Sequence, residues 1–148
     1  MGECFNGDPA YVGPYQSCVE GLFNYPMYYT IRDIWVSGKS MYNIRDRYNA
    51  ESGSFSDITA LGVFVDNHDN SRFLYSQKDY MHFKSAIAFA LTSQGIPFFY
   101  YGDEQGFSGG NDPNNREIMW NSFDTTSELY QFVKTINTAK NYKQIYNQ

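Results

Sequence analysis

The residues with the clearest chemical potential follow a short apolar run. Residues 61–65 are hydrophobic without polar alternation, which is typical of a strand buried on both faces. The run leads into Asn67, His68 and Asp69. Polar side chains that leave an apolar strand are partly desolvated, so they need hydrogen-bond partners or a ligand. We predict that they bind a polyhydroxyl or carbonyl substrate. The alternative is a strand-end cap whose hydrogen bonds the protein satisfies by itself.

Two further segments carry charged groups next to turns. Residues 109–116 are rich in turn formers and end in Arg116, and this composition alone would explain a surface loop. A loop that carries Asp112 and Arg116 after a strand could instead close over a site at the rim of a sheet. Glu3 stands before the turn formers at residues 6–9, which is a weak signal by itself.

A metal centre has less support. His82 falls in a predicted helix, far in sequence from His68, so no second histidine stands at ligand spacing. Two cysteines, Cys4 and Cys18, cannot form a closed four-ligand zinc site. They could bridge a short loop in an oxidising compartment or remain thiols. We therefore assign no metal ligands.

The elements that must position these residues alternate along the chain. Helical periodicity or start signals predict helices over residues 24–48, 79–92 and 124–142. Ser37 and Gly38 break the first, and Thr125 with Glu128 predicts a capping box for the last. A second apolar strand is predicted over residues 96–101, with Pro97 near its start, and a weaker one over 21–25.

This alternation predicts an α/β fold. Each of the two strong strands is followed by a polar cluster and then a helix, which indicates βα units around a parallel sheet. In such folds, polar groups at the carboxyl ends of strands form the ligand site. We therefore expect one site at one rim of the sheet.

Composition sets limits on the class of protein. The 148 residues are 42 % hydrophobic and 18 % charged, which excludes a charge-dominated disordered chain. Eleven Lys and Arg against sixteen Asp and Glu give a net charge of −5, and no basic cluster is visible, which argues against nucleic acid as a partner. The longest uncharged stretch, residues 85–102, contains Gly and Pro, so no membrane helix is predicted. The 19 % of aromatic residues is typical of sugar-stacking clefts, but also of aromatic-rich cores.

Taken together, the segments resemble the second half of the catalytic barrel of α-amylases, glycoside hydrolase family 13, in its fungal-type branch. Four segments resemble the regions of the fifth to eighth barrel strands, in order: residues 2–16, 22–29, 64–69 and 95–116. The resemblance implies a (β/α)8 TIM barrel, of which residues 1–148 form the partial second half.

The resemblance also implies roles for individual residues. Glu3 matches the general acid/base that protonates the leaving glycosidic oxygen and then activates water. Asp69 matches the carboxylate that holds sugar hydroxyls and favours the oxocarbenium-like transition state, and His68 matches a donor to the same sugar. Other matched substrate contacts lie on the non-reducing side (Asp112 and Arg116) and on the leaving-group side (Phe5, Asn6 and Gly7).

Part of the family's machinery has no counterpart here. A retaining glycosidase needs a second carboxylate as nucleophile, and the family carries it on the fourth strand, upstream of Glu3. The family's structural calcium ligands are also mostly upstream. Because a barrel needs eight strands and about 250 residues to close, we expect this chain to be an inactive fragment of a larger secreted enzyme. The resemblance implies that the complete enzyme is monomeric, binds calcium and hydrolyses α-1,4 bonds of starch, glycogen and maltooligosaccharides. No secretory leader is visible at residue 1.

Three alternatives remain open. The chain could be a non-catalytic starch-binding module, an inactive barrel remnant, or part of a glucosidase or transglycosylase of the same family. Glu3 at the acid position favours an enzyme, because sugar binding does not require it. Residues 7–11 favour an amylase within the family.

Overall fold

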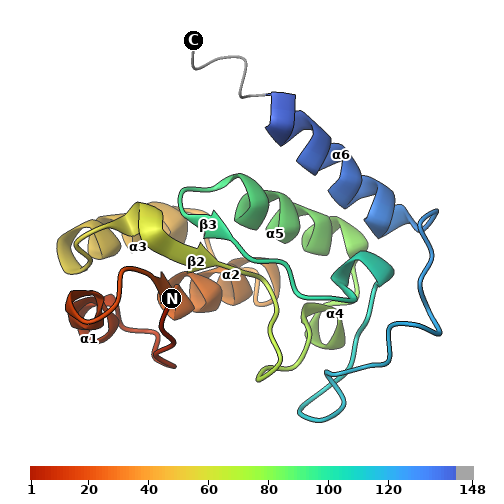
Figure 1. Ribbon diagram of the computed structural model, residues 1–148, viewed down its shortest axis with the longest axis horizontal. Coiled ribbons are helices and arrows are strands. Elements are labelled where there is room, and N and C mark those ends of the chain that lie inside the picture. Colours follow the sequence, from red (N-terminus) through yellow and green to blue (C-terminus); the bar gives the residue numbers. More distant parts are fainter. Residues whose placement is uncertain (143–148) are drawn as a thin grey trace.

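The computed structural model describes residues 1–142 and is built around a parallel sheet (Figure 1). Its three short strands lie in the order β1 (Leu22–Phe23), β2 (Leu61–Val63) and β3 (Ile96–Pro97). Leu22 pairs with Leu61 and Gly62 pairs with Ile96, both in parallel register. Gly2 forms an isolated parallel bridge to Leu22, so the chain start lies beside β1.

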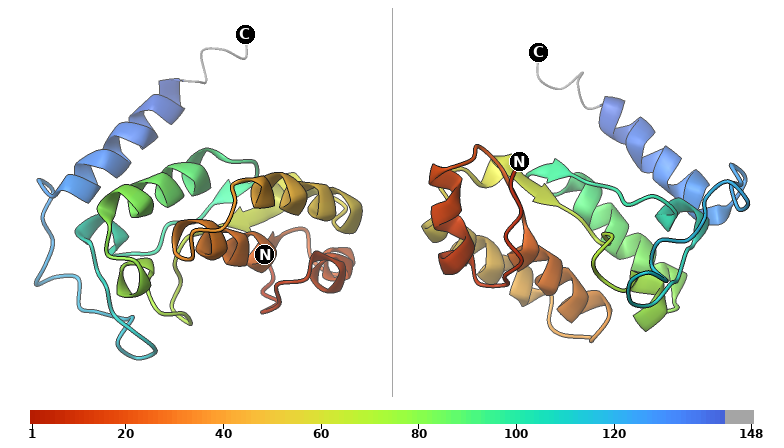
Figure 2. Two further views of the ribbon diagram at one scale, coloured as in Figure 1. Left: turned by 180° about the vertical axis from the view of Figure 1, so that it is seen from behind. Right: turned by 60° about the horizontal axis from the view of Figure 1, so that its bottom comes forward.

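Helices connect the strands, which confirms the α/β prediction. The helical elements are α1 (Pro9–Val12), η1 (Gly13–Ser17), α2 (Tyr25–Trp35), α3 (Tyr42–Ser54), η2 (Ile58–Ala60), α4 (Phe73–Ser76), α5 (Tyr80–Thr92), η3 (Asp103–Gln105) and α6 (Glu128–Tyr142). The two views agree that α2 and α5 flank the sheet on the same side (Figure 2). None of the helices within residues 1–142 is long and apolar enough to cross a membrane.

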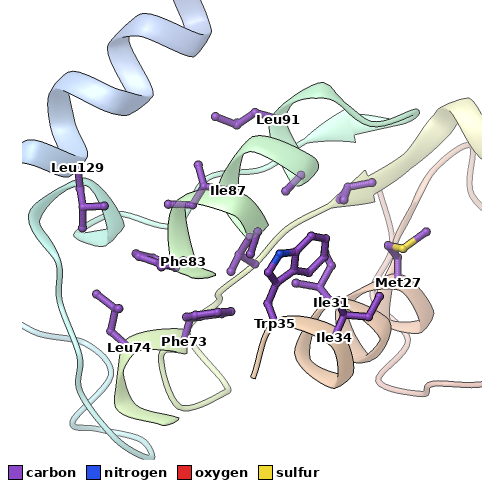
Figure 3. Packing of buried hydrophobic residues seen from close by; sticks show 14 residues of the cluster. Met27, Ile31, Ile34, Trp35, Phe73, Leu74, Phe83, Ile87, Leu91 and Leu129 are labelled. Atoms are coloured by element: carbon purple, nitrogen blue, oxygen red, sulfur yellow. The ribbon is translucent and has the colours of Figure 1, made fainter. Parts of the chain in front are cut away.

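The main core lies between the sheet and these two helices (Figure 3). Val63 of β2 and Val65 after it face buried side chains of α2, α4 and α5. Phe73 and Phe83 stack with ring centroids 5.0 Å apart, and both are fully buried. Leu129 brings the start of α6 onto the same cluster. Burial of this apolar area is what holds the strands against their helices.

The opposite face of the sheet is lined by aromatic rings. Phe23 and Phe98 lie with ring centroids 4.7 Å apart, on either side of β2. A Cβ at Gly62 would lie 3.0 Å from Phe98 and 3.1 Å from Phe23, so the missing side chain lets the two rings meet. Phe98 is 37 % exposed. Within residues 1–142 its ring contacts the ring of Phe23, and it contacts no aromatic ring of a helix.

The predicted helices are mostly confirmed, with corrected ends. The break at Gly38 is real, since this residue has φ +70° between α2 and α3. The capping box at Thr125 is wrong: Asp124 accepts from the Thr126 amide, and the Ser127 hydroxyl accepts from the Tyr130 amide, so α6 begins later.

The predicted strands are present but shorter than expected. The pairing of residues 96–101 ends at Pro97, because the chain then leaves the sheet. The rings of Tyr100 and Tyr101 lie instead against the guanidinium of Arg72. The run 61–65 likewise pairs only as far as Val63.

Candidate active site

One chain of hydrogen bonds links Glu3 to residues that follow β1 and β2. The hydroxyl of Tyr25, the first residue of α2, donates to Glu3 Oε1 at 2.6 Å. Asn67, after β2, donates from Nδ2 to the same hydroxyl oxygen at 2.8 Å. Burial of Tyr25, together with the adjacent Glu3 carboxylate, raises the pKa of this hydroxyl well above its ordinary value. The hydroxyl therefore stays protonated and holds the carboxylate in place.

The polar run after β2 divides into a local cap and an exposed pair. Asn67 Oδ1 accepts from the amide nitrogens of Asp69 (3.1 Å) and Asn70 (3.0 Å). Asn67 therefore forms a strand-end cap, which was the alternative to a ligand-binding role. His68 and Asp69 project outward, with Nε2 and Oδ1 3.3 Å apart and side chains 54 % and 43 % exposed.

The loop at residues 109–116 closes over this rim. Arg116 Nη2 lies 3.9 Å from Asp69 Oδ1, and its Nε lies 2.7 Å from Asp112 Oδ1. The same Nε donates to the main-chain oxygen of His68 at 3.3 Å. The structure thus brings four exposed polar side chains together, which we call the rim group: His68, Asp69, Asp112 and Arg116.

The residues after Glu3 form a turn beside this site. Phe5 presents a ring that is 58 % exposed and meets Tyr25 edge-on at 4.7 Å. Asn6 Oδ1 accepts a hydrogen bond from the Asp8 amide. A Cβ at Gly7 would lie only 2.8 Å from the Tyr29 ring. Phe5 therefore offers a surface for stacking, whereas Asn6 and Gly7 shape the backbone.

A pocket of about 170 Å³ opens between these elements. Its walls are mainly aromatic, with Glu3, His68 and Asn67 among the few polar groups that line it. Asp69, Asp112 and Arg116 stand outside this lining. An apolar concavity with a few convergent polar groups is typical of small-molecule sites.

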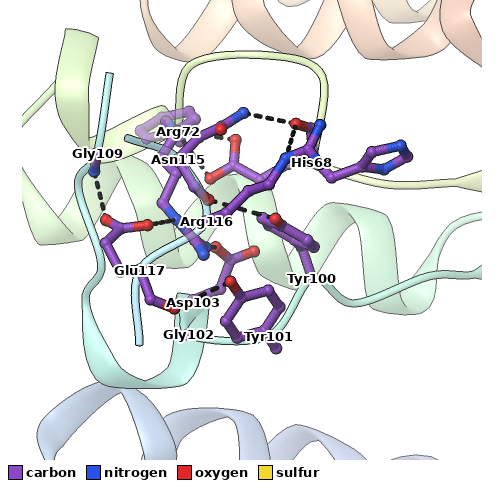
Figure 4. Close-up of polar contacts among 12 residues, drawn as sticks. His68, Arg72, Tyr100, Tyr101, Gly102, Asp103, Gly109, Asn115, Arg116 and Glu117 are labelled. Atoms are coloured by element: carbon purple, nitrogen blue, oxygen red, sulfur yellow. Dashed lines mark hydrogen bonds and ion pairs between the residues drawn. The ribbon is translucent and has the colours of Figure 1, made fainter. Parts of the chain in front are cut away.

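Beneath the rim lies a buried ionic assembly that the sequence reasoning missed (Figure 4). The Arg72 guanidinium is fully buried and lies 2.7 Å from Glu117 Oε2 and 3.0 Å from Asp103 Oδ1. Three aromatic rings surround it, with centroids 4.4 to 5.2 Å from its central carbon. We call the charged members the buried cluster: Asp66, Arg72, Asp103 and Glu117.

The buried cluster connects β2 to the loop at residues 109–116. Both carboxylate oxygens of Asp66 accept from the Phe73 amide at 2.8 Å. Burial raises the pKa of Asp66 and of Asp103, and the facing Asp66 charge further raises that of Asp103. Glu117 Oε1 accepts from the Gly109 amide at 2.6 Å. The sequence contains one indication of this cluster, because Asp66 directly follows the apolar run at residues 61–65.

The histidines and cysteines of residues 1–142 lie apart from one another or pair locally. Within this range no three His, Cys, Asp or Glu side chains are grouped to hold one. His82 pairs through Nδ1 with Asp79 Oδ2 at 3.1 Å, at the start of α5. Cys4 and Cys18 are free thiols in this structure.

The family model of the α-amylase catalytic domain matches residues 1–146. The chain belongs to the α-amylase family, glycoside hydrolase family 13. The α-amylase of Saccharomycopsis fibuligera is 44 % identical over 143 residues, which cover 95 % of this chain.

Solved structures agree with this assignment. An α-amylase from Malbranchea cinnamomea superposes with a TM-score of 0.90 at 38 % identity over 95 % of the chain. The α-amylase of Geobacillus thermoleovorans, solved with acarbose, superposes with a TM-score of 0.81 at 30 % identity over 91 % of it. The chain spans only 29 %, 30 % and 32 % of these three relatives, respectively.

Proposed function

We propose that this chain forms the second half, strands five to eight, of an α-amylase catalytic barrel. The barrel hydrolyses α-1,4-glucosidic bonds of starch and related α-glucans with retention of configuration. The observation that carries the proposal is the hydrogen-bond chain from Glu3 through Tyr25 to Asn67, because it links the Glu3 carboxylate to the segment that also carries His68 and Asp69.

Glu3 acts as the general acid and base in this account. Because Tyr25 donates to its Oε1, the other oxygen, Oε2, is left to carry the proton that the leaving glycosidic oxygen receives. Once the leaving sugar has departed, the same carboxylate takes a proton from the attacking water. Tyr25 holds the carboxyl in one orientation through both steps.

Asp69 and its neighbours bind the sugar at which positive charge develops. The Asp69 side chain is 43 % exposed, so its oxygens remain available to sugar hydroxyls. His68 donates to the same sugar. Asp112 and Arg116 bind further sugars on the non-reducing side, while Phe5, Asn6 and Gly7 line the leaving-group side.

The nucleophile comes from the rest of the barrel. A retaining mechanism needs a carboxylate roughly 5–5.5 Å from the acid, and the family pattern assigns none of the carboxylates of this chain to that role. The ring of Phe98, which is 37 % exposed, and the half-buried ring of Phe23 beside it support this proposal, since they would belong to the interior layer that the other strands of a barrel cover. Calcium binding, secretion and a monomeric state of the complete enzyme rest on family membership.

A chimera tests the proposal. Residues 1–146 of this chain replace the matching segment of the Saccharomycopsis fibuligera α-amylase, which supplies the remaining strands. We expect the folded chimera to release reducing ends from soluble starch, with the anomeric configuration retained when products are followed by NMR. A chimera that melts cooperatively and binds starch but releases no reducing ends would contradict the proposal and favour a binding module.

A further inference from the structure

We propose that Asn115 is a positioning residue that fixes the backbone on both sides of Asp69. Its side chain is fully buried, and Nδ2 donates to the main-chain oxygens of His68 and Asn70, each at 2.8 Å (Figure 4). These two oxygens belong to the residues directly before and after Asp69. The inference rests on the proposed function of Asp69.

The chemistry of this contact calls for an amide. Both hydrogens of the Asn115 amino group are directed at carbonyl oxygens, and a terminal amide supplies two such donors on one atom. A carboxylate in its place would set an oxygen against two carbonyl oxygens. A serine hydroxyl would supply one donor for two acceptors and leave a buried oxygen unpaired.

The segment around Asp69 is held from two directions. Asn67 Oδ1 accepts from the amides of Asp69 and Asn70, and Asn115 donates to the oxygens on either side. The Asp69 side chain is 43 % exposed, and its side-chain contacts, His68 Nε2 at 3.3 Å and Arg116 Nη2 at 3.9 Å, come from side chains that are themselves about half exposed. The contacts that fix its backbone are those of the two asparagines.

The same loop provides a matched control. Asn111 also joins the loop at residues 109–116 to the segment that follows β2, since Ser71 Oγ donates to its Oδ1 at 2.6 Å. This contact is exposed and lies at Ser71, two residues beyond Asp69. The substitution Asn111→Asp therefore makes the same chemical change as Asn115→Asp, from an amide to a carboxylate. Unlike Asn115→Asp, it does not alter a contact to the residues that flank Asp69.

The kinetic test uses the chimera with Asn115→Asp, Asn115→Ser and the control Asn111→Asp. We expect both Asn115 variants to lower kcat by about 10- to 100-fold with little change in KM, because small misplacements of a group that acts in the transition state cost this much. We also expect Asp69→Asn to cost less in the Asn115→Ser background than alone, because both changes act through one interaction. Independent, multiplicative effects would overturn the inference.

Amide hydrogen exchange tests the clamp without reference to activity. We expect the amides of Asp69 and Asn70 to exchange faster in Asn115→Ser than in the unaltered chimera or in Asn111→Asp. Unchanged exchange at both amides would overturn the inference even if activity fell. If the unaltered chimera were folded but inactive, the proposed function would fail, and faster exchange would still establish the clamp.

Discussion

The rim group and the buried cluster consist of the same kinds of side chain in opposite surroundings. Side chains of the rim group are 43–54 % exposed, and its contact between Arg116 and Asp69 is as long as 3.9 Å. Arg72 and Asp103 of the buried cluster are 0 % and 2 % exposed and pair at 3.0 Å. Most polar atoms of the buried cluster are thus paired within the protein, with Arg72 Nη2 as an exception, whereas the side chains of the rim group remain open to solvent.

This difference has an energetic consequence. Exposed ion pairs contribute about 0–1 kcal/mol to stability, because water and salt screen them. Removal of one partner of a buried pair costs about 3–5 kcal/mol, because the other charge is left without compensation. Substitutions in the buried cluster should therefore change stability, and substitutions in the rim group should change activity.

Arg72→Met gives the largest expected effect. We expect the free energy of unfolding of the chimera to fall by about 3–5 kcal/mol, because Asp103 and Glu117 lose their buried cation. Urea denaturation measures this. Arg45→Met is the control, since Arg45 pairs with Asp46 at the surface and should cost less than about 1 kcal/mol. Equal losses for the two variants would remove the distinction between the regions.

Glu51 extends the comparison to a buried acid that has lost most of its solvation. It is 1 % exposed, and burial raises its pKa from 4.5 to about 7, against the lowering effects of Asn24 and Arg47. The folded state therefore binds this proton more tightly than the unfolded state does. The contribution of this proton to the free energy of unfolding is complete below about pH 4.5 and is lost as the pH rises through 7.

Glu51→Gln should remove this pH dependence. We expect the variant to be more stable than the parent by about 3 kcal/mol above pH 7, and the difference to shrink toward pH 4.5. Urea denaturation at a series of pH values measures it, with the exposed Glu20→Gln as control. A difference that does not vary with pH would show that Glu51 is ionised normally in the folded protein.

Asp112→Asn gives the smallest expected effect. Asp112 holds the Arg116 guanidinium at 2.7 Å on the surface of the loop. We expect kcat/KM of the chimera on maltooligosaccharides to fall about tenfold, equivalent to about 1.4 kcal/mol, with an unchanged melting temperature. A lower melting temperature with unchanged kcat/KM would place this residue with the structural group instead.

Local patterns predict the part of this molecule in which neighbours in sequence act together. The buried strand before Asn67, the helix at residues 79–92 and the break at Gly38 are all features of short windows. Glu3 was identified by family resemblance and not by periodicity, because its local sequence shows only one carboxylate before a turn.

The remaining features depend on contacts between distant segments. Arg72 meets Asp103 and Glu117 across 31 and 45 residues, and in sequence it looks like an ordinary surface charge. Asn115 lies among turn formers, where a buried amide is the less expected outcome. The error at Thr125 has a similar cause, because Ser127 is also tied to the Glu104 oxygen across 23 residues.

The most direct test of the account is the activity of the Glu3→Gln chimera on starch, beside the exposed control Glu20→Gln. Glutamine can still accept from Tyr25 but cannot deliver the proton that the leaving oxygen needs. We predict that kcat falls about 10²- to 10⁴-fold in Glu3→Gln with an unchanged melting temperature, while the control keeps full activity. Full activity in a folded Glu3→Gln chimera would contradict the central claim that this chain supplies the acid of an α-amylase.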